Sequence, residues 1–319
     1  MPARFLRFKL HGVSERSREP LLERLLARAD ECSIAPDWRR DAFAVLAPGV
    51  PLPPLAPLAL KSAGIAPATG SLRAPSRGAP SPPVPSPVPA WVCLATPVHY
   101  LAELSNVRFA GDGMLILDAA EAAALALDFN RLWSGADVHL WAASKRLFCG
   151  FDAPLEVTTQ DPELARGRHL QGFLPAGRDA AHLRRLMSEM EMWLFDHAVN
   201  QRRRDESHLP ISGLWLWGGG APLGALPAVH GGASGEDLLA ETFPAAGDRV
   251  ADVMVAGAVP GGREWQELES RWLEPTLADL RRGRITRLEL SAGEKRFALS
   301  ASWLRRFWRR AKPWWEYFE

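Results

Sequence analysis

Cysteine is scarce in this sequence, which has only Cys32, Cys93 and Cys149 among its 319 residues. Their number is odd, and no two of them stand at the CxxC spacing of a zinc or redox motif. The sequence therefore predicts neither a disulfide framework nor a structural zinc site. Chains without disulfides are typical of reducing compartments, so we expect a cytoplasmic protein.

An excess of charge and long apolar runs are lacking as well. Lysine and arginine number 38 against 37 for aspartate and glutamate, which gives a formal net charge of +1. No global field therefore attracts nucleic acid or a membrane surface. No stretch approaches the roughly 20 apolar residues that span a bilayer, and the opening MPARFLRFKLHG lacks the apolar run of a secretory signal. We expect neither a membrane nor a nucleic-acid partner.

Hydrophobic periodicity alternates between helical and strand-like spacing along the chain. The predicted helices cover 18–31, 38–46, 119–132, 180–197, 265–282 and 302–310. The predicted strands cover 114–117, 155–159, 214–217 and 250–259, with hairpins over 138–151 and 285–300. Such alternation indicates an α/β or α+β fold, with a mixed sheet flanked by helices.

Proline is concentrated in one region, because 13 of the 27 prolines lie between Pro48 and Ala90. Residues 71–89 are almost entirely Ser, Pro, Ala, Gly and Val, and such a segment can neither complete a strand ladder nor bury much apolar surface. We predict three parts: an N-terminal segment over 1–60, a disordered proline-rich linker over 61–90, and one domain over 91–319 that ends in a basic, aromatic helix.

Motifs that would identify a particular chemistry are missing. The sequence has no GxGxxG, no phosphate-binding loop with its lysine, and no recognisable Ser-His-Asp or Cys-His arrangement. The eight histidines are scattered without metal-ligand spacing. We therefore predict no metal site and no cofactor.

The densest cluster of polar residues closes the helix predicted over 180–197. His197 and Asn200 stand three apart, so on a helix they share a face and could hold one polar ligand. Gly218, Gly219 and Gly220 end an apolar strand, and their backbone N–H groups could approach an anion closely. Each pattern also has a structural explanation that involves no ligand. In that explanation, His197 is a histidine at the edge of the core that is hydrogen-bonded within the protein, and the glycines form a tight turn.

The segment SEMEMWLFDHAVNQRRRDESHLPISGLWLWGGG, residues 188–220, resembles a stretch of the archaeal-type cofactor-independent phosphoglycerate mutases. In that family a helix bearing HPVN leads through a strand to a glycine-rich turn. The motifs ATPVHY at 95–100 and TTQDPE at 158–163 are more weakly similar to two further family stretches. Residues 91–220, together with the ending LRRFWRRAKPWW, resemble RpfE-type bacterial regulatory proteins.

The resemblance implies a ligand-binding role for Asp161, His197, Asn200, Arg203, Gly218, Gly219 and Gly220. In the mutases this region takes part in substrate recognition, while two metals and a hydroxyl nucleophile perform the chemistry. This sequence departs from the family: it has no early Asp-Gly-x-x-Asp type motif and no later Asp-x-x-x-His pattern, and Ala198 replaces the proline of HPVN. We therefore predict no catalytic residues and no mutase activity.

Three functional hypotheses follow. The first is a mutase-like regulatory or binding protein that takes up a phosphorylated small metabolite, with Arg203 as the anion partner. The second is a metal-dependent phosphomutase or phosphohydrolase whose ligands escape recognition. The third is a protein-interaction module that uses its tryptophan-rich surface and the basic tail over 303–319.

Overall fold

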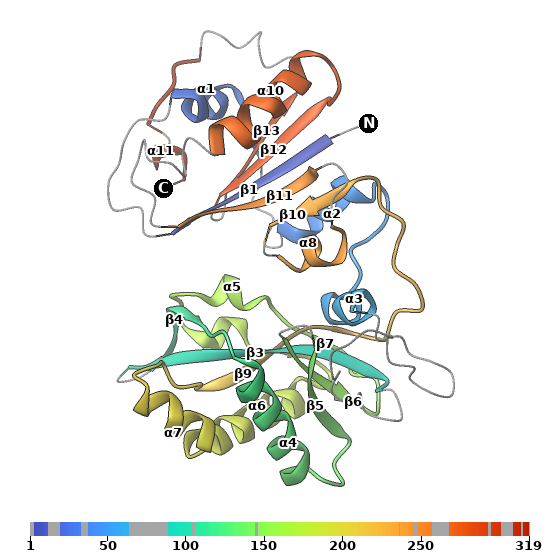
Figure 1. The fold of residues 1–319 in the computed structure, drawn as a ribbon, viewed down its shortest axis with the longest axis vertical. Coiled ribbons are helices and arrows are strands. Elements are labelled where there is room, and N and C mark those ends of the chain that lie inside the picture. Colours follow the sequence, from blue (N-terminus) through green and yellow to red (C-terminus); the bar gives the residue numbers. More distant parts are fainter. Residues whose placement is uncertain are drawn as a thin grey trace. The chain divides into compact units, whose positions relative to one another are not determined.

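In a computed structural model, the chain divides into two compact units (Figure 1). The central unit is Pro53–Leu226, and the terminal unit combines Met1–Leu52 with Pro227–Glu319. The residues that the structure describes are 3–11, 20–32, 38–63, 89–103, 106–143, 146–235, 237–244, 248–256, 268–292, 295–300, 309–313 and 315–318. Most of the predicted linker, and most of the helix predicted over 302–310, lie outside these ranges.

A six-stranded mixed sheet organises the terminal unit. In spatial order its strands are β10 (Gly232–Ser234), β11 (Asp248–Ala256), β1 (Ala3–His11), β12 (Arg287–Ala292), β13 (Lys295–Ser300) and β2 (Asp30–Cys32). Neighbours are parallel from β10 to β12 and antiparallel from β12 to β2. Among the described residues of this unit, the helices are α1 (Pro20–Arg28), α2 (Trp38–Leu46), α8 (Leu238–Thr242), the π-helix η2 (Leu268–Leu273), α10 (Glu274–Arg281) and α11 (Trp315–Phe318).

This division differs from the predicted domain boundaries. We expected residues 1–60 and 91–319 to belong to separate parts of the chain. Instead β1 lies between β11 and β12 and pairs with both, so the N-terminal residues group with the C-terminal ones. Nothing in the local pattern of a strand reveals a partner that lies more than 200 residues away.

The two faces of the terminal sheet are buried by different helices. Alternate residues of a strand point to opposite faces, and in β1 Leu6 joins a buried cluster with leucines of α1, α10 and β12. Its neighbour Phe5 instead stacks on Trp38 of α2, with ring centroids 6.3 Å apart. Helices α1 and α10 therefore cover one face, and α2 covers the other.

A buried ion pair joins α2 to the start of α8. Arg39 Nε donates to Asp237 Oδ2 at 2.9 Å, and Arg39 Nη2 lies 2.8 Å from the same oxygen. The two side chains are only 6% and 5% exposed. Asp237 also caps α8 by accepting from the backbone N–H of Leu239 at 2.9 Å. Loss of Arg39 would leave the Asp237 carboxylate buried without its opposite charge.

We expect Arg39→Met to lower the free energy of unfolding by about 3–5 kcal/mol, because it leaves the Asp237 carboxylate buried and unpaired. Urea unfolding followed by circular dichroism measures the change. The matched control is Arg40→Met at the neighbouring exposed position of α2, which should shift stability by no more than about 0.5 kcal/mol. Equal losses in the two variants would contradict the role given to the ion pair.

An antiparallel sheet around β3 (Trp91–Ala102) organises the central unit. One edge of β3 pairs with β9 (Gly213–Gly220). The other edge pairs with β6 (Arg146–Phe151) along its first part and with β4 (Val107–Met114) along its last part. Strand β5 (Val138–Ala143) follows β6, and β7 (Val157–Thr158) pairs with β8 (Ala176–Gly177) in a separate small sheet.

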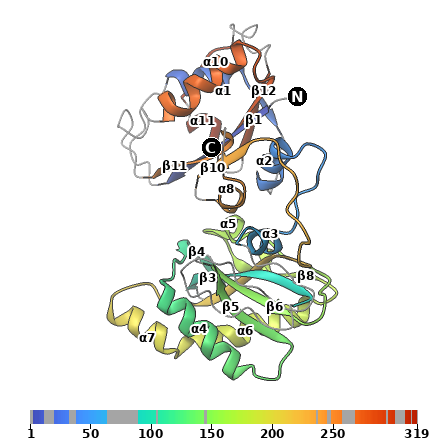
Figure 2. The same cartoon turned by 45° about the vertical axis from the view of Figure 1, so that its right-hand side comes forward.

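Helices cover both faces of this sheet. They are α3 (Leu55–Ser62), α4 (Ala119–Leu132), α5 (Pro162–Ala165), the 3₁₀-helix η1 (Leu170–Phe173), α6 (Ala180–Phe195) and α7 (Ala198–Asp205). Figures 1 and 2 show α4, α6 and α7 together on one side of the sheet, with α3 and α5 on the other. In that layer α4 packs against β5 and α6 packs against β9.

The mixed α/β architecture confirms the predicted fold class. Helix α4 begins after Asp118 as predicted, in a capping box that Asp118 shares with Glu121. Two expectations for single elements are wrong. The strand expected over 114–117 already ends at Met114, and Ile116 is 89% exposed. The helix expected to begin near Asp179, to continue past His197 and to fray through 202–204 is two helices, because the backbone becomes extended at His197.

Candidate functional site

His197 forms the corner between α6 and α7. Its backbone is extended (φ −64°, ψ 141°), and its Nδ1 accepts from the backbone N–H of Val199 at 3.1 Å, which makes it the N-cap of α7. The neutral imidazole then carries its proton on Nε2, which lies 3.4 Å from Asp128 Oδ2 on α4. The ring packs edge to face on Trp193, with centroids 4.8 Å apart. The imidazole of His197 therefore makes its hydrogen bond within the protein, with the backbone N–H of Val199. This is the structural explanation given above for His197.

Asn200 is buried, and its amide is fully engaged. Its Nδ2 donates to the carbonyls of Leu194 at 2.7 Å and Ile211 at 2.8 Å, and its Oδ1 accepts from the N–H of Ile211 at 2.7 Å. The side chain therefore ties the end of α6 to the segment that leads into β9. These three bonds meet both amide donors and leave one lone pair of Oδ1, so Asn200 acts as an internal brace.

Arg203, the predicted anion partner, is paired within the protein. Its Nη1 donates to Glu121 Oε1 at 2.8 Å, and its Nε donates to the carbonyl of Leu209 at 2.8 Å. The two charged side chains are 8% and 10% exposed. The three motif residues His197, Asn200 and Arg203 are thus brought together on α7, where each holds α7 to a neighbouring segment.

The three glycines belong to β9 rather than to an open cradle. Only Gly218 has a left-handed backbone, with φ +64°, and its N–H donates to Thr159 Oγ1 at 3.1 Å. A Cβ on Gly219 would overlap the ring of Trp91, and one on Gly220 would overlap Pro54. The glycines therefore make room for these two rings against the strand.

Asp161 is the N-cap of α5. Its Oδ1 accepts from the backbone N–H of Glu163 at 2.9 Å, and Pro162 follows at the first helical position. The preceding Gln160 accepts through its carbonyl from Trp215 Nε1 at 2.8 Å, so this segment lies against β9. The structure thus places Asp161 with the β9 side of the predicted site, and His197, Asn200 and Arg203 with the α7 side.

A cavity of about 400 Å³ lies elsewhere in the central unit, between the connection from α4 to β5, the end of β6, and α6. Its lining residues are Trp133, Ala136, Asp137, Val138, Phe151, Ala153, Leu155, His182, Arg185, Leu186 and Glu189. This cavity was not predicted from the sequence. In the sequence, the residues at 182, 185 and 189 are polar and stand at helical spacing. Such a pattern cannot be told from the solvent-exposed face of an ordinary helix.

Aromatic side chains build the inner wall of the cavity. Trp133 stacks on Phe129 with centroids 4.3 Å apart and meets Trp193 edge to face at 5.6 Å. The ring of His182 lies 6.2 Å from that of Phe151. At the rim, Arg185 Nε donates to Glu189 Oε1 at 2.9 Å, while the Arg185 side chain remains 81% exposed. An apolar interior with a few polar groups at its rim is typical of small-molecule sites.

The buried thiols lie in the sheet. Cys93 and Cys149 stand opposite each other on β3 and β6, and both are fully buried. Burial raises the pKa of the Cys93 thiol well above its ordinary range, and the neighbouring Cys149 adds to the effect. A thiol that resists ionisation is a poor nucleophile and metal ligand, so Cys93 is a core residue rather than a reactive one.

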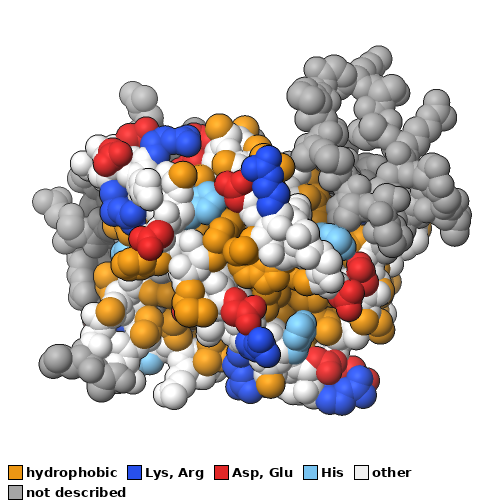
Figure 3. Space-filling view, turned by 90° about the horizontal axis from the view of Figure 1, so that it is seen from below, with side chains coloured by type: hydrophobic (Ala, Val, Ile, Leu, Met, Phe, Trp, Pro, Cys, Tyr) orange, Lys and Arg blue, Asp and Glu red, His pale blue; other side chains and the backbone are white. Residues whose placement is uncertain are grey.

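Apolar side chains also reach the surface. Figure 3 shows hydrophobic side chains gathered across the middle of one face, with charged side chains around them. On α6, Met192 and Phe195 are 72% and 74% exposed, and on α4 Leu127 and Leu132 are 53% and 60% exposed. Met192 and Phe195 stand three apart and therefore share a side of the helix.

Within the described residues, no group of three or more His, Cys, Asp or Glu side chains is placed to hold a metal ion. Among the helices of the same part of the chain, none has the length and apolar character needed to cross a membrane.

The comparisons with known proteins find distant structural similarity only. No family model and no curated protein sequence matches the chain. The solved structure of a cofactor-independent phosphoglycerate mutase from Thermoplasma acidophilum is 14% identical, covers 93% of this chain and 90% of its own, and has a TM-score of 0.34. A protein of Pyrococcus horikoshii is 12% identical, covers 94% and 88%, and has a TM-score of 0.36. Similarity at this level carries no argument about function.

We expect Gly219→Ala to destabilise the protein by about 1–3 kcal/mol, because the added methyl group overlaps the Trp91 ring and the core must shift to admit it. Denaturant unfolding measures the loss. In the control Gly224→Ala the new methyl group meets nothing within 4 Å, so stability should be unchanged or slightly higher. A neutral Gly219→Ala would favour the open anion cradle.

Burial lowers the pKa of His197, although the Asp128 carboxylate partly offsets the effect. As the pH falls below about 6.5, the unfolded chain takes up a proton before folded His197 does. The stability that neutral His197 contributes is therefore complete above this pH and is lost as the pH falls toward the folded-state pKa.

His197→Asn keeps an acceptor at the N-cap and should reduce the loss of stability between pH 7.5 and 5.5. The exposed control His208→Asn should leave it unchanged, and equal pH dependence in all three proteins would contradict the prediction.

Proposed function

We propose that this protein is a phosphoglycerate mutase-like binding protein with a regulatory role, which takes up a small metabolite in the cavity beside α6. The observation that carries the proposal is the cavity itself, with its volume of about 400 Å³ and its mainly apolar lining. Small-molecule sites have this size and character. The resemblance of residues 91–220 to RpfE-type regulatory proteins supports regulation rather than turnover as the role.

The apolar wall selects the body of the ligand. Trp133 and Phe151 offer aromatic surfaces, and Val138 and Leu186 add aliphatic ones. Of these, Val138, Phe151 and Leu186 are buried. Burial of apolar ligand area against such a wall is favourable by roughly 25 cal/mol per Å². The preferred ligand therefore carries a ring or a short hydrocarbon portion.

The rim selects one anionic group. Arg185 uses Nε for its bond to Glu189, and a guanidinium has four further N–H donors that suit a phosphate or a carboxylate. His182 lies at the same cavity and can add a donor. Asp137 and Glu189 line the cavity as well, so a second anionic group would be repelled. The phosphorylated metabolite predicted from the sequence fits these groups better than Arg203, which is already bound to Glu121.

In this proposal the motif residues support the cavity instead of touching the ligand. His197 packs on Trp193, which in turn packs on Trp133 in the cavity wall. Asn200 and Arg203 hold the end of α6 and the start of α4 through hydrogen bonds. The corner therefore fixes α6, which lines the cavity, and α4, which is followed by Trp133 of the cavity wall.

We expect phosphorylated ligands to bind more tightly than their unphosphorylated counterparts. The assay is calorimetry with phenyl phosphate against phenol. Arg185→Gln should weaken binding of the phosphorylated ligand about tenfold, the loss of roughly one charge-assisted hydrogen bond. The exposed neighbour Arg184, which does not line the cavity, provides the matched control Arg184→Gln.

Ala153→Trp provides a second test of ligand binding. Ala153 is an exposed residue of the cavity lining, and a tryptophan there should fill the cavity. This variant should lose binding of every ligand. Equal affinities for the Arg184 and Arg185 variants would overturn the assignment of the rim. Turnover of 3-phosphoglycerate with added Mn²⁺ would instead favour the alternative of a metal-dependent phosphomutase or phosphohydrolase.

Binding of a protein partner is the second candidate function. The exposed pair Met192 and Phe195 on α6 favours it, whereas residues 303–308, 314 and 319 of the basic tail lie outside the described residues. This candidate predicts that Phe195→Ser abolishes capture of a partner and leaves ligand binding in the cavity unchanged.

A further inference from the structure

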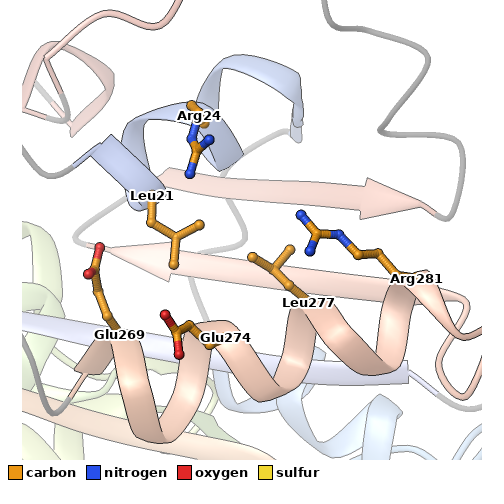
Figure 4. Close-up of a pocket in the computed structure, with 6 residues that line it drawn as sticks. All are labelled: Leu21, Arg24, Glu269, Glu274, Leu277 and Arg281. Atoms are coloured by element: carbon orange, nitrogen blue, oxygen red, sulfur yellow. The ribbon is translucent and has the colours of Figure 1, made fainter.

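A groove of about 460 Å³ lies between α1 and α10 in the terminal unit (Figure 4). Its residues Arg24, Glu269 and Arg281 already have partners within the protein, and Leu277 of its lining is only 3% exposed. With three of its four charged side chains engaged and little apolar surface accessible, this groove has few groups left for an outside ligand. The cavity beside α6 in the central unit is different.

The lining of that cavity includes a carboxylate without a partner. Arg185 and Glu189 bind each other at 2.9 Å, so their charges cancel. Asp137 is exposed, and its side chain has no hydrogen bond or ion pair within the described part of the chain. With His182 counted as neutral, the lining therefore has one uncompensated negative charge, which favours a ligand with a positive group.

A tight turn between α4 and β5 fixes the position of Asp137. The N–H of Ala136 donates to the carbonyl of Trp133 at 3.0 Å, and Gly135 in this turn has a left-handed backbone with φ +86°. The carbonyl of Asp137 accepts from the N–H of Asp152 at 3.2 Å, which joins the turn to the residue after β6. Asp137 is therefore held through its backbone, and its carboxylate is left for a ligand.

The accessible part of the lining determines which kind of cation fits. Trp133 and Leu155 are half-buried, and Ala136 and Ala153 are exposed, so this surface is apolar. A primary ammonium is strongly hydrated and has three N–H donors to satisfy, which an apolar surface does not do. A quaternary ammonium has no N–H, and its methyl groups can cover apolar side chains while its charge stays near Asp137. Aromatic side chains such as Trp133 are typical of sites for such groups.

We propose that the ligand of this cavity is a phosphoester of an amino alcohol that bears a quaternary ammonium group. This ligand class rests on the proposed function, in which Arg185 and His182 bind the phosphate. The ammonium lies beside Asp137, and its methyl groups cover Trp133 and Leu155. Because Asp137 and Arg185 come from different segments of the lining, one ligand meets both. A volume of about 400 Å³ is near the lower end of the range of small-molecule sites, roughly 300–1,000 Å³, and suits so compact a molecule.

Calorimetry on the full chain with three phosphoesters tests the proposal. Phosphocholine bears the quaternary ammonium, phosphoethanolamine bears a primary one, and 3,3-dimethylbutyl phosphate has the shape of phosphocholine without its positive charge. Phosphocholine should bind about fivefold more tightly than 3,3-dimethylbutyl phosphate, the contribution of one ion pair at a partly exposed rim. Phosphoethanolamine should bind more weakly than phosphocholine, because it lacks the three methyl groups that cover the apolar lining.

A variant of Asp137 locates the positive group. Asp137→Asn should lower the affinity for phosphocholine to that for 3,3-dimethylbutyl phosphate, without weakening the latter. Because Asp137 is exposed, the variant should keep its fold. The matched control is Asp152→Asn, next to Ala153 of the lining. The Asp152 carboxylate lies 3.4 Å from His139 Nε2 and does not line the cavity, so this control should keep most of the preference for phosphocholine.

The outcomes separate this proposal from the proposed function. If 3,3-dimethylbutyl phosphate bound as tightly as phosphocholine or more tightly, the quaternary ammonium would be overturned and the phosphoester site would stand. An equal loss of preference in the Asp137 and Asp152 variants would show a general charge effect and would overturn the role of Asp137. If none of the three phosphoesters bound, both proposals would be wrong.

Discussion

Both carboxylate oxygens of Glu121 are used at one buried position in the central unit. Oε2 accepts from the backbone N–H of Asp118 and so caps α4, while Oε1 accepts from Arg203 on α7. A carboxylate whose side chain is 10% exposed is tolerated only with such partners, and removal of one partner from a buried pair typically costs about 3–5 kcal/mol. The start of α4 and the whole of α7 are therefore fixed relative to each other by one side chain.

The corner at His197 makes that contact possible. If α6 continued as a single helix, Arg203 would follow the α6 axis away from α4, and Glu121 would stay buried and unpaired. The N-cap at His197 turns the chain, and Asn200 holds the new direction through its bonds to Leu194 and Ile211. The side chains that resemble the mutase motif thus build a joint between helices. This joint also holds in place the helices that stand beside the cavity near α6.

Local patterns predicted what local interactions determine. Helix α4 with its Asp118 cap, and the hairpin of β5 and β6, are visible in sequence because their signals lie within about fifteen residues. The break at His197 was missed, because residues 198–205 are compatible with helix and only the ring's bond to Val199 reveals a cap. The interior use of Arg203 was also missed, because its partner lies 82 residues away. The cavity could not be predicted, because three distant segments supply its lining.

The position of β1 between β11 and β12 has a consequence for the order in which the protein can form. On the ribosome, the contiguous central unit emerges complete while β1 still lacks both of its neighbours. At about 5–20 residues per second, the roughly 280 residues between β1 and the end of β12 take about 15 s to 1 min to synthesise. Throughout this time Phe5 and Leu6, which are fully buried in the folded protein, have neither neighbouring strand to cover them. The nascent chain therefore has a defined interval in which chaperone binding to its first residues would be most effective.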